Sequence, residues 1–188
     1  DLTGKLLGAP RMGSVEGLER LRANVRLPAV RHELWHGFIF VNLDADAPPL
    51  APSLAKVEPF WENYERADLV AVPPVPADTV LPWNWKLHFE NFTDAYHPEF
   101  VHRGTHDFAP SNHVDGGVRF TAMAATDNAI VRTVPMIKSD GGMMREGWGE
   151  TAAFPAIDTL TAEQRKRLTF VMIPPGMTIV FAPNAVAY

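Results

Sequence analysis

The stretch NWKLHFENFTDAYHPEFVH, residues 84–102, carries most of what this sequence says about fold and chemistry. It favours a helix, and Asp94 and His97 are three residues apart, so they share one face of that helix. His97 and His102 are five residues apart and would diverge on an unbroken helix. Pro98 disfavours helical geometry at His97 and predicts a turn there. Such a turn can bring both imidazoles to one point, as a metal ion requires.

Two histidines and a carboxylate on one face are a ligand set that Fe(II) accepts, with coordination positions left open. Glu90, Asn91 and Tyr96 are candidates for neighbouring groups that orient the imidazoles. The chain has seven histidines in 188 residues, so a close pair of histidines is weak support by itself. Those without acidic neighbours at a suggestive spacing are expected to be structural or exposed to solvent, namely His32, His36, His88 and His113.

The composition argues against several other classes of protein. Hydrophobic residues make up 46% and charged residues 21%, which is typical of a globular chain. The net charge of -5 argues against a nucleic-acid partner, and no apolar run approaches the length of a membrane span. There is no cysteine, which excludes disulfides and thiolate-bound metals within this stretch. No signal peptide is apparent, and we expect a cytoplasmic protein without a membrane partner.

The pattern along the chain predicts an antiparallel α+β fold. Residues 1–46 favour short strands and turns, including a strand at 37–43, and the proline-rich segment 47–52 is the best domain boundary. After it, Ser53 is expected to cap a helix that Pro59 kinks or splits. This helix presents apolar residues at helical spacing, namely Leu54, Val57, Trp61 and Tyr64.

The second half of the chain predicts one further helix followed mainly by hairpins. The helix extends from Trp83 to about His97. Strands are predicted at 117–126 and 129–134, and again at 168–173 and 177–181, each pair joined by a turn. Thr161 and Gln164 have the spacing of a capping box, which predicts a short helix at 162–167.

These residues together resemble the α subunits of the Rieske non-haem iron oxygenases, the ring-hydroxylating enzymes. That family carries Asn-Trp-Lys, then Glu-Asn, then Asp-x-x-His-x-x-x-x-His, and residues 84–102 match all three in order. Residues 1–10 are similar to the family's segment after the second Cys-x-x-His of the Rieske cluster, and residues 37–44 to the strand that closes that domain. Residues 181–184, Phe-Ala-Pro-Asn, are similar to a Phe-Pro-Asn pattern of the catalytic domain. The resemblance covers nearly the whole chain.

The resemblance implies roles for individual residues. His97 and His102 would bind the mononuclear Fe(II), and Asp94 would bridge one of these histidines to a Rieske-cluster histidine of the neighbouring subunit, so that it carries the electron route. Residues 1–46 would be the C-terminal remnant of the Rieske domain. Residues 47–188 would be the N-terminal part of a helix-grip, START-like catalytic domain. The Rieske ligands would precede Asp1, and the third, carboxylate ligand would lie beyond Tyr188, so the chain alone is expected to be inactive.

The implied activity is oxygenation of an organic substrate with O2, and we expect the substrate to be aromatic. The enzyme would be a monooxygenase or a dioxygenase of aromatic catabolism. Electrons would come from NAD(P)H through a reductase or ferredoxin and a [2Fe-2S] Rieske cluster. The implied assembly is a homotrimer or an α3β3 oligomer. Four residues are candidates for the wall of the substrate pocket, although core packing explains each of them as well: Phe92, Phe100, Val101 and Met123.

Three alternatives stay open at this stage. A quaternary amine such as choline or carnitine is the other substrate class of the family, and five tryptophans could supply an aromatic cage. A START-like binding module would keep the fold without a metal. A zinc hydrolase would use His97, His102 and His106. Neither of the last two explains Asn84–Lys86 together with Glu90 and Asn91.

Overall fold

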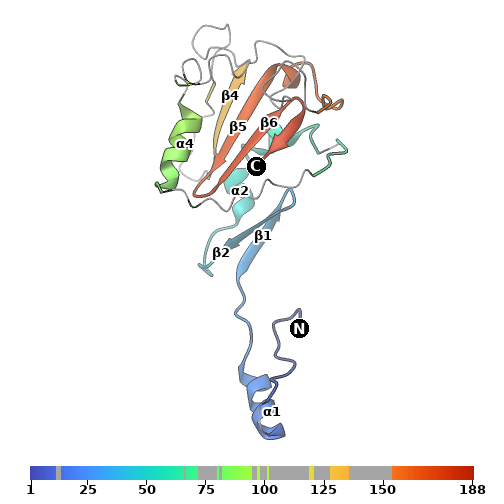
Figure 1. Cartoon of the computed structure of the whole chain (residues 1–188), viewed down its shortest axis with the longest axis vertical. Coiled ribbons are helices and arrows are strands. Elements are labelled where there is room, and N and C mark those ends of the chain that lie inside the picture. Colours follow the sequence, from blue (N-terminus) through green and yellow to red (C-terminus); the bar gives the residue numbers. More distant parts are fainter. Residues whose placement is uncertain are drawn as a thin grey trace. The chain divides into compact units, whose positions relative to one another are not determined.

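The computed structural model divides into two compact units, Asp1–Ala51 and Pro52–Tyr188 (Figure 1). The assignment of residues 1–46 to a Rieske domain and of residues 47–188 to a catalytic domain remains a prediction. The structure describes residues 1–11, 14–65, 67–71, 80, 82–94, 97, 101, 119–120, 128–135 and 154–188.

The first unit contains a helix, α1, at Val15–Asn24, where the sequence predicts only short strands and turns, so that prediction is wrong. The helix forms because Ser14 caps it: the Ser14 hydroxyl accepts a hydrogen bond from Gly17 N–H at 3.0 Å. Arg22 then donates to the carbonyl of Leu7 and ties the helix to the preceding loop. None of the helix residues is buried, although Val15, Leu18 and Leu21 are three residues apart, a spacing that suits a helix.

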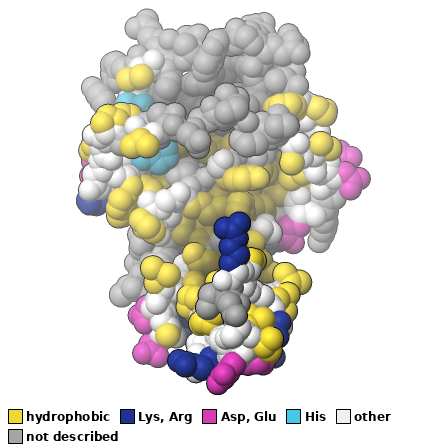
Figure 2. Space-filling view, turned by 60° about the horizontal axis from the view of Figure 1, so that its bottom comes forward, with side chains coloured by type: hydrophobic (Ala, Val, Ile, Leu, Met, Phe, Trp, Pro, Cys, Tyr) yellow, Lys and Arg dark blue, Asp and Glu magenta, His cyan; other side chains and the backbone are white. Residues whose placement is uncertain are grey.

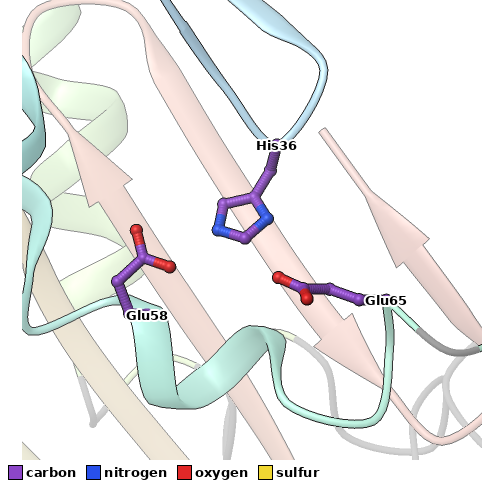
Figure 3. A group of neighbouring side chains, drawn as sticks. All are labelled: His36, Glu58 and Glu65. Carbon is purple, nitrogen blue, oxygen red and sulfur yellow. The ribbon is translucent and has the colours of Figure 1, made fainter.

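The rest of this unit is a hairpin of β1, Arg31–Trp35, and β2, Phe38–Asn42. The segment 37–43 was predicted to be a strand, and β2 confirms it. The turn consists of His36 and Gly37, whose φ angles are 46° and 84°. Two consecutive positive φ angles are typical of the type I′ turn, which matches the twist of a hairpin. His36 therefore has a structural position at the turn (Figure 3).

The second unit begins with two short helices, α2 at Leu50–Leu54 and α3 at Glu58–Trp61. The predicted split of this segment is confirmed, and Pro59 lies in the first turn of α3, where the missing N–H costs nothing. Ser53 lies inside α2 and does not cap a helix, which corrects the prediction. Glu58 opens α3 and Glu65 follows its end; both are exposed (Figure 3). The four apolar residues predicted to share a face are all buried: Leu54, Val57, Trp61 and Tyr64.

Five antiparallel strands form the sheet of the second unit, in the order β3-β4-β5-β6-β7 (Figure 1). Both predicted hairpins are present where the structure describes them, and residues 117–118 and 121–127 lie outside the described residues. The sequence pattern does not predict β7, because three small residues carry little strand signal. The strands are β3 at Arg119–Phe120, β4 at Ile130–Pro135, β5 at Arg167–Ile173, β6 at Met177–Ala182 and β7 at Ala185–Ala187.

Strand β5 is covered on both faces. Thr169 lies opposite Phe181, whose ring packs against Trp61 at 4.8 Å between centroids, so one face meets the α3 segment. Phe170 points to the other face, because side chains alternate along a strand, and its ring contacts Phe92 at 5.6 Å. Phe92 belongs to helix α4, Trp85–Thr93. This two-sided burial explains why β5 is apolar at nearly every position.

A polar network joins the segment after α3 to the segment before β5. Gln164 Oε1 accepts from Thr161 N–H at 2.9 Å and Gln164 N–H donates to Thr161 Oγ1 at 3.2 Å, which confirms the capping box. The same side chain accepts from Asn63 Nδ2 and donates to the carbonyl of Glu62. The helix that follows is shorter than predicted, a 3₁₀ turn at Gln164–Lys166, because β5 begins at Arg167.

The mixed helical and antiparallel architecture confirms the predicted α+β class in the described part of the chain; the helix-grip description remains a prediction. No helix within the described residues is long and apolar enough to cross a membrane. Hydrophobic side chains are also visible on the surface (Figure 2). The exposed hydrophobic residues of the described chain include Leu34, Ile39 and Val41 in the hairpin of the first unit, each about two-thirds exposed or more.

Tyr64 provides a test of the packing around β6. Burial raises the pKa of Tyr64 to about 12, against a smaller lowering effect of the Arg167 charge, and its hydroxyl donates to the carbonyl of Ala182 at 3.2 Å. The unfolded chain loses this proton near pH 10, so the stabilisation is complete below pH 10 and is lost as the pH rises towards 12. Over this pH range we expect the free energy of unfolding of the unsubstituted protein to fall by up to about 3 kcal/mol more than that of Tyr64→Phe.

The measurement is the free energy of unfolding by denaturant at pH 8, 10 and 11.5. Tyr188→Phe is the matched control, because Tyr188 is 81% exposed and should leave the alkaline loss unchanged. Equal losses in Tyr64→Phe and in the unsubstituted protein would contradict this account.

Candidate metal centre

Helix α4 begins at Trp85 because Asn84 caps it. The Asn84 side chain accepts from Lys86 N–H at 3.1 Å, while the backbone of Asn84 is extended, with φ -71° and ψ 139°. Within the helix Trp85 and Phe89, four residues apart, meet edge-to-face at 5.2 Å between ring centroids. Phe89 is buried and Phe92 contacts β5. The first part of the stretch 84–102 therefore builds a helix and places its end beside the sheet.

The helix ends at Thr93, four residues before the predicted end at His97. Asp94 leaves helical geometry, with φ -66° and ψ 115°, while its N–H still donates to the carbonyl of Glu90 at 2.8 Å. The Thr93 hydroxyl donates to the same carbonyl at 3.0 Å. The prediction that Asp94 and His97 share one face of a continuous helix is thus wrong about the backbone, although the two side chains do meet.

Asp94 and His97 form a close pair. Asp94 Oδ2 lies 3.1 Å from the backbone nitrogen of His97, which donates to it, and 3.2 Å from His97 Nδ1. The carboxylate therefore holds both the backbone and the ring of His97. The His97 side chain is 17% exposed and that of Asp94 is 45% exposed. A carboxylate on Nδ1 is the usual orienting partner of a metal-binding histidine, because it leaves the ring lone pair on Nε2.

The remaining predicted site residues are only partly described. His102, His106, Tyr96, Phe100 and Met123 lie outside the described residues. Their predicted roles stay predictions.

Glu90 and Asn91 are exposed on α4, Phe92 is half-buried against Phe170 and His88, and Val101 is 68% exposed. The structure brings Asp94 and His97 together and places Phe92 at the same end of α4.

Sequence reasoning missed one residue at this place, Arg132 of β4. Its guanidinium is buried, and Nη1 donates to the carbonyl of Phe92 at 2.7 Å. A signal was available, since Arg132 is the one charged residue of the predicted strand 129–134, and a buried cation needs partners. Its partner cannot be predicted from the sequence, because it is the backbone carbonyl of Phe92, forty residues away.

The segment that contains the Asp94–His97 pair is similar to known proteins. The model of a family described as "Ring hydroxylating alpha subunit (catalytic domain)" matches residues 60–188, which include α4, the Asp94–His97 pair and the whole sheet. The chain belongs to this family. The family resemblance stated from the sequence is thereby confirmed. No solved structure matches the chain.

Curated relatives are named as large oxygenase components of dioxygenase systems. One, of a 2,4-dinitrotoluene dioxygenase system from Burkholderia sp. (strain RASC), is 40% identical over 77 residues, which are 38% of this chain and 16% of the relative. Another, of a naphthalene 1,2-dioxygenase system from Pseudomonas putida, is 38% identical over 77 residues, with the same two coverages. This chain of the ring-hydroxylating α-subunit family thus spans about a sixth of the length of these relatives.

Substitution of Asn84 tests whether its side chain stabilises the start of helix α4. Replacing Asn84 by Ala removes the acceptor for Lys86 N–H, and we expect a loss of about 1 kcal/mol in the free energy of unfolding. Asn84→Asp keeps an acceptor at the helix N-terminus and should retain the stability. Denaturant unfolding of the three proteins checks this, and equal stability of Asn84→Ala would show that the cap is not needed.

Proposed function

We propose that this chain is part of the catalytic α subunit of a ring-hydroxylating oxygenase, in which His97 and His102 bind a mononuclear Fe(II). The observation that carries the proposal is the Asp94–His97 pair, which lies inside the segment matched by the family. A third, carboxylate ligand would come from outside this chain. Bound Fe(II) would supply the activation of O2 for oxygenation of the substrate.

The donor set present in the chain fits such an ion. His97 has its Nδ1 against a carboxylate oxygen at 3.2 Å, so the carboxylate orients the ring and favours the tautomer with the lone pair on Nε2. Imidazole and carboxylate are the ligands that non-haem Fe(II) takes in its two-histidine, one-carboxylate sites. The residues of this chain would therefore hold the ion, orient its histidine and shape the space beside it.

We assign to Asp94 the role of bridge to the Rieske cluster of a neighbouring subunit. Its carboxylate is engaged with His97, yet 45% of the side chain is exposed. A group that joins two redox centres across an interface must satisfy both conditions, because it has to touch one centre and be reachable from the neighbouring subunit. This role implies a ring of subunits, either a homotrimer or an α3β3 assembly.

The substrate is proposed to be aromatic, and electrons are proposed to arrive from NAD(P)H through a reductase or ferredoxin and a [2Fe-2S] cluster. The names of the relatives support this, because they are components of 2,4-dinitrotoluene and naphthalene dioxygenase systems. The family match also favours the oxygenase over a metal-free binding module and over a zinc hydrolase.

Substitution of the histidines tests the metal site. In the full-length α subunit, His97→Ala and His102→Ala are each expected to abolish iron at the mononuclear site, since each removes a ligand. The visible spectrum of the Rieske cluster should persist. Iron and zinc content by elemental analysis, together with the absorption spectrum, checks this.

The control is His88→Gln, on helix α4, which should retain full iron. Retention of mononuclear iron in His97→Ala would overturn the assignment. Zinc in place of iron in the unsubstituted subunit would favour the hydrolase.

Substitution of Asp94 tests the bridge. In the full-length subunit supplied with saturating Fe(II), Asp94→Ala should hold both metal centres, although with weaker iron affinity, and turnover of an aromatic substrate such as naphthalene should fall by about 10- to 100-fold or more. Reduction of the cluster by the reductase should be unaffected, whereas its reoxidation in a single turnover should slow to the same extent. Asp68→Ala, which removes an exposed carboxylate of the same unit, is the matched control. Normal reoxidation in Asp94→Ala would show that Asp94 is no bridge.

A further inference from the structure

Arg132 has an unusual position for a charged residue. It lies in β4, directly opposite Phe170 of β5, and only 3% of its surface is exposed. A buried guanidinium is costly unless it is hydrogen-bonded or paired with a negative charge. The partners that the structure provides for it therefore indicate what it does.

The first partner is the end of helix α4. Nη1 of Arg132 donates to the carbonyl of Phe92 at 2.7 Å, and Phe92 is the next-to-last residue of the helix. The last carbonyls of a helix have no acceptor role within it, and they carry the negative end of its dipole. A cation placed there satisfies one of these carbonyls and is held by the dipole in return.

The second partner is an aromatic surface. The Arg132 guanidinium lies 5.8 Å from the centroid of the Phe170 ring, within the range of a cation–π contact. Phe170 also packs against Phe92, at 5.6 Å between ring centroids. Arg132, Phe170 and Phe92 thus contact one another in a closed set that joins β4, β5 and α4.

Asp94 lies two residues beyond Phe92, just after the end of α4. Its negative charge acts on Arg132 at longer range: burial lowers the pKa of Arg132, and the charge of Asp94 raises it. Arginine keeps its proton in proteins, so the cation persists near this end of the helix. Asp94 is the residue that holds both the backbone and the ring of His97.

We infer that Arg132 is a positioning residue for the Asp94–His97 pair: it fixes the point at which α4 ends, and thereby the place of the carboxylate that orients His97. The functional part of this inference rests on the proposed iron site, whereas its structural part does not. Arg132 acts through Phe92 and Asp94 and has no role as a ligand.

A positioning role predicts local effects. Arg132→Met keeps the length and apolar packing of the side chain but removes the donor and the charge, so the end of α4 should loosen while the sheet stays intact. Amide exchange of residues 92–97 should become at least about tenfold faster. Exchange of β5 and β6 should stay unchanged. Iron affinity of the full-length subunit should fall about 10- to 100-fold.

The experiment is hydrogen exchange followed by mass spectrometry on the full-length α subunit, both as isolated with iron and after removal of the mononuclear iron by a chelator. Arg132→Lys keeps a cation without the planar fork and should restore part of the protection and of the iron affinity. Arg167→Met removes an arginine from β5 of the same sheet and should leave residues 92–97 unchanged. If Arg132→Met does not fold, the exchange of residues 92–97 is compared between Arg132→Lys and Arg167→Lys instead.

Unchanged exchange of residues 92–97 in Arg132→Met would overturn the inference. Faster exchange spread equally over β4, β5 and β6 would also overturn it, because it would show a general role in the core. Faster exchange confined to residues 92–97 in the metal-free subunit supports positioning by Arg132. If that result came with an unsubstituted subunit that binds no mononuclear iron, the proposed function would fail and the structural inference would stand.

Discussion

The packing of Phe92 on Phe170 is the contact on which the candidate site depends. It attaches the end of α4 to β5, and β5 is in turn held from the opposite face by the α3 segment through Phe181 and Trp61. The place where α4 stops is therefore set by a sheet that is buried on both sides. A short helix is marginally stable alone, and it is this tertiary packing that makes its end a defined point. Asp94 and His97 inherit their positions from it.

The chemistry of the site follows from how the helix ends. Once Asp94 leaves helical geometry, its side chain accepts from the backbone and ring of His97, an arrangement that a continuous helix would not give in the same form. The change from helix to extended backbone thus lets the Asp94 carboxylate contact the ring of His97, while part of the Asp94 side chain stays exposed. Arg132 is buried next to the same end of α4 and adds a fixed positive charge there.

Much of this arrangement is predictable from the sequence. The rest cannot be predicted, and the reasons are physical. The split at Pro59, the Thr161–Gln164 capping box and the hairpin of β5 and β6 depend on local chemistry that the residues show directly. Helix α1 was missed although its local signals are in the sequence: Ser14 caps it, and Val15, Leu18 and Leu21 follow at a spacing of three. It buries no residue, so these local signals alone mark it. The end of α4 at Thr93 was missed because it depends on the contact with Arg132, which comes from a distant strand. The motif within residues 84–102 identified the family, but its local backbone is decided by tertiary contacts.

The two-sided burial of β5 also has an evolutionary consequence. Thr169 and Phe170 are adjacent in the chain yet serve opposite layers, so the insertion or deletion of one residue within β5 would exchange the two layers and detach α4 from its support. Length differences among members of the family should therefore accumulate in the connections between strands and be purged from β4, β5 and β6. Diversification within the family would proceed by changes of side chains on this sheet and by lengthening of the loops around it.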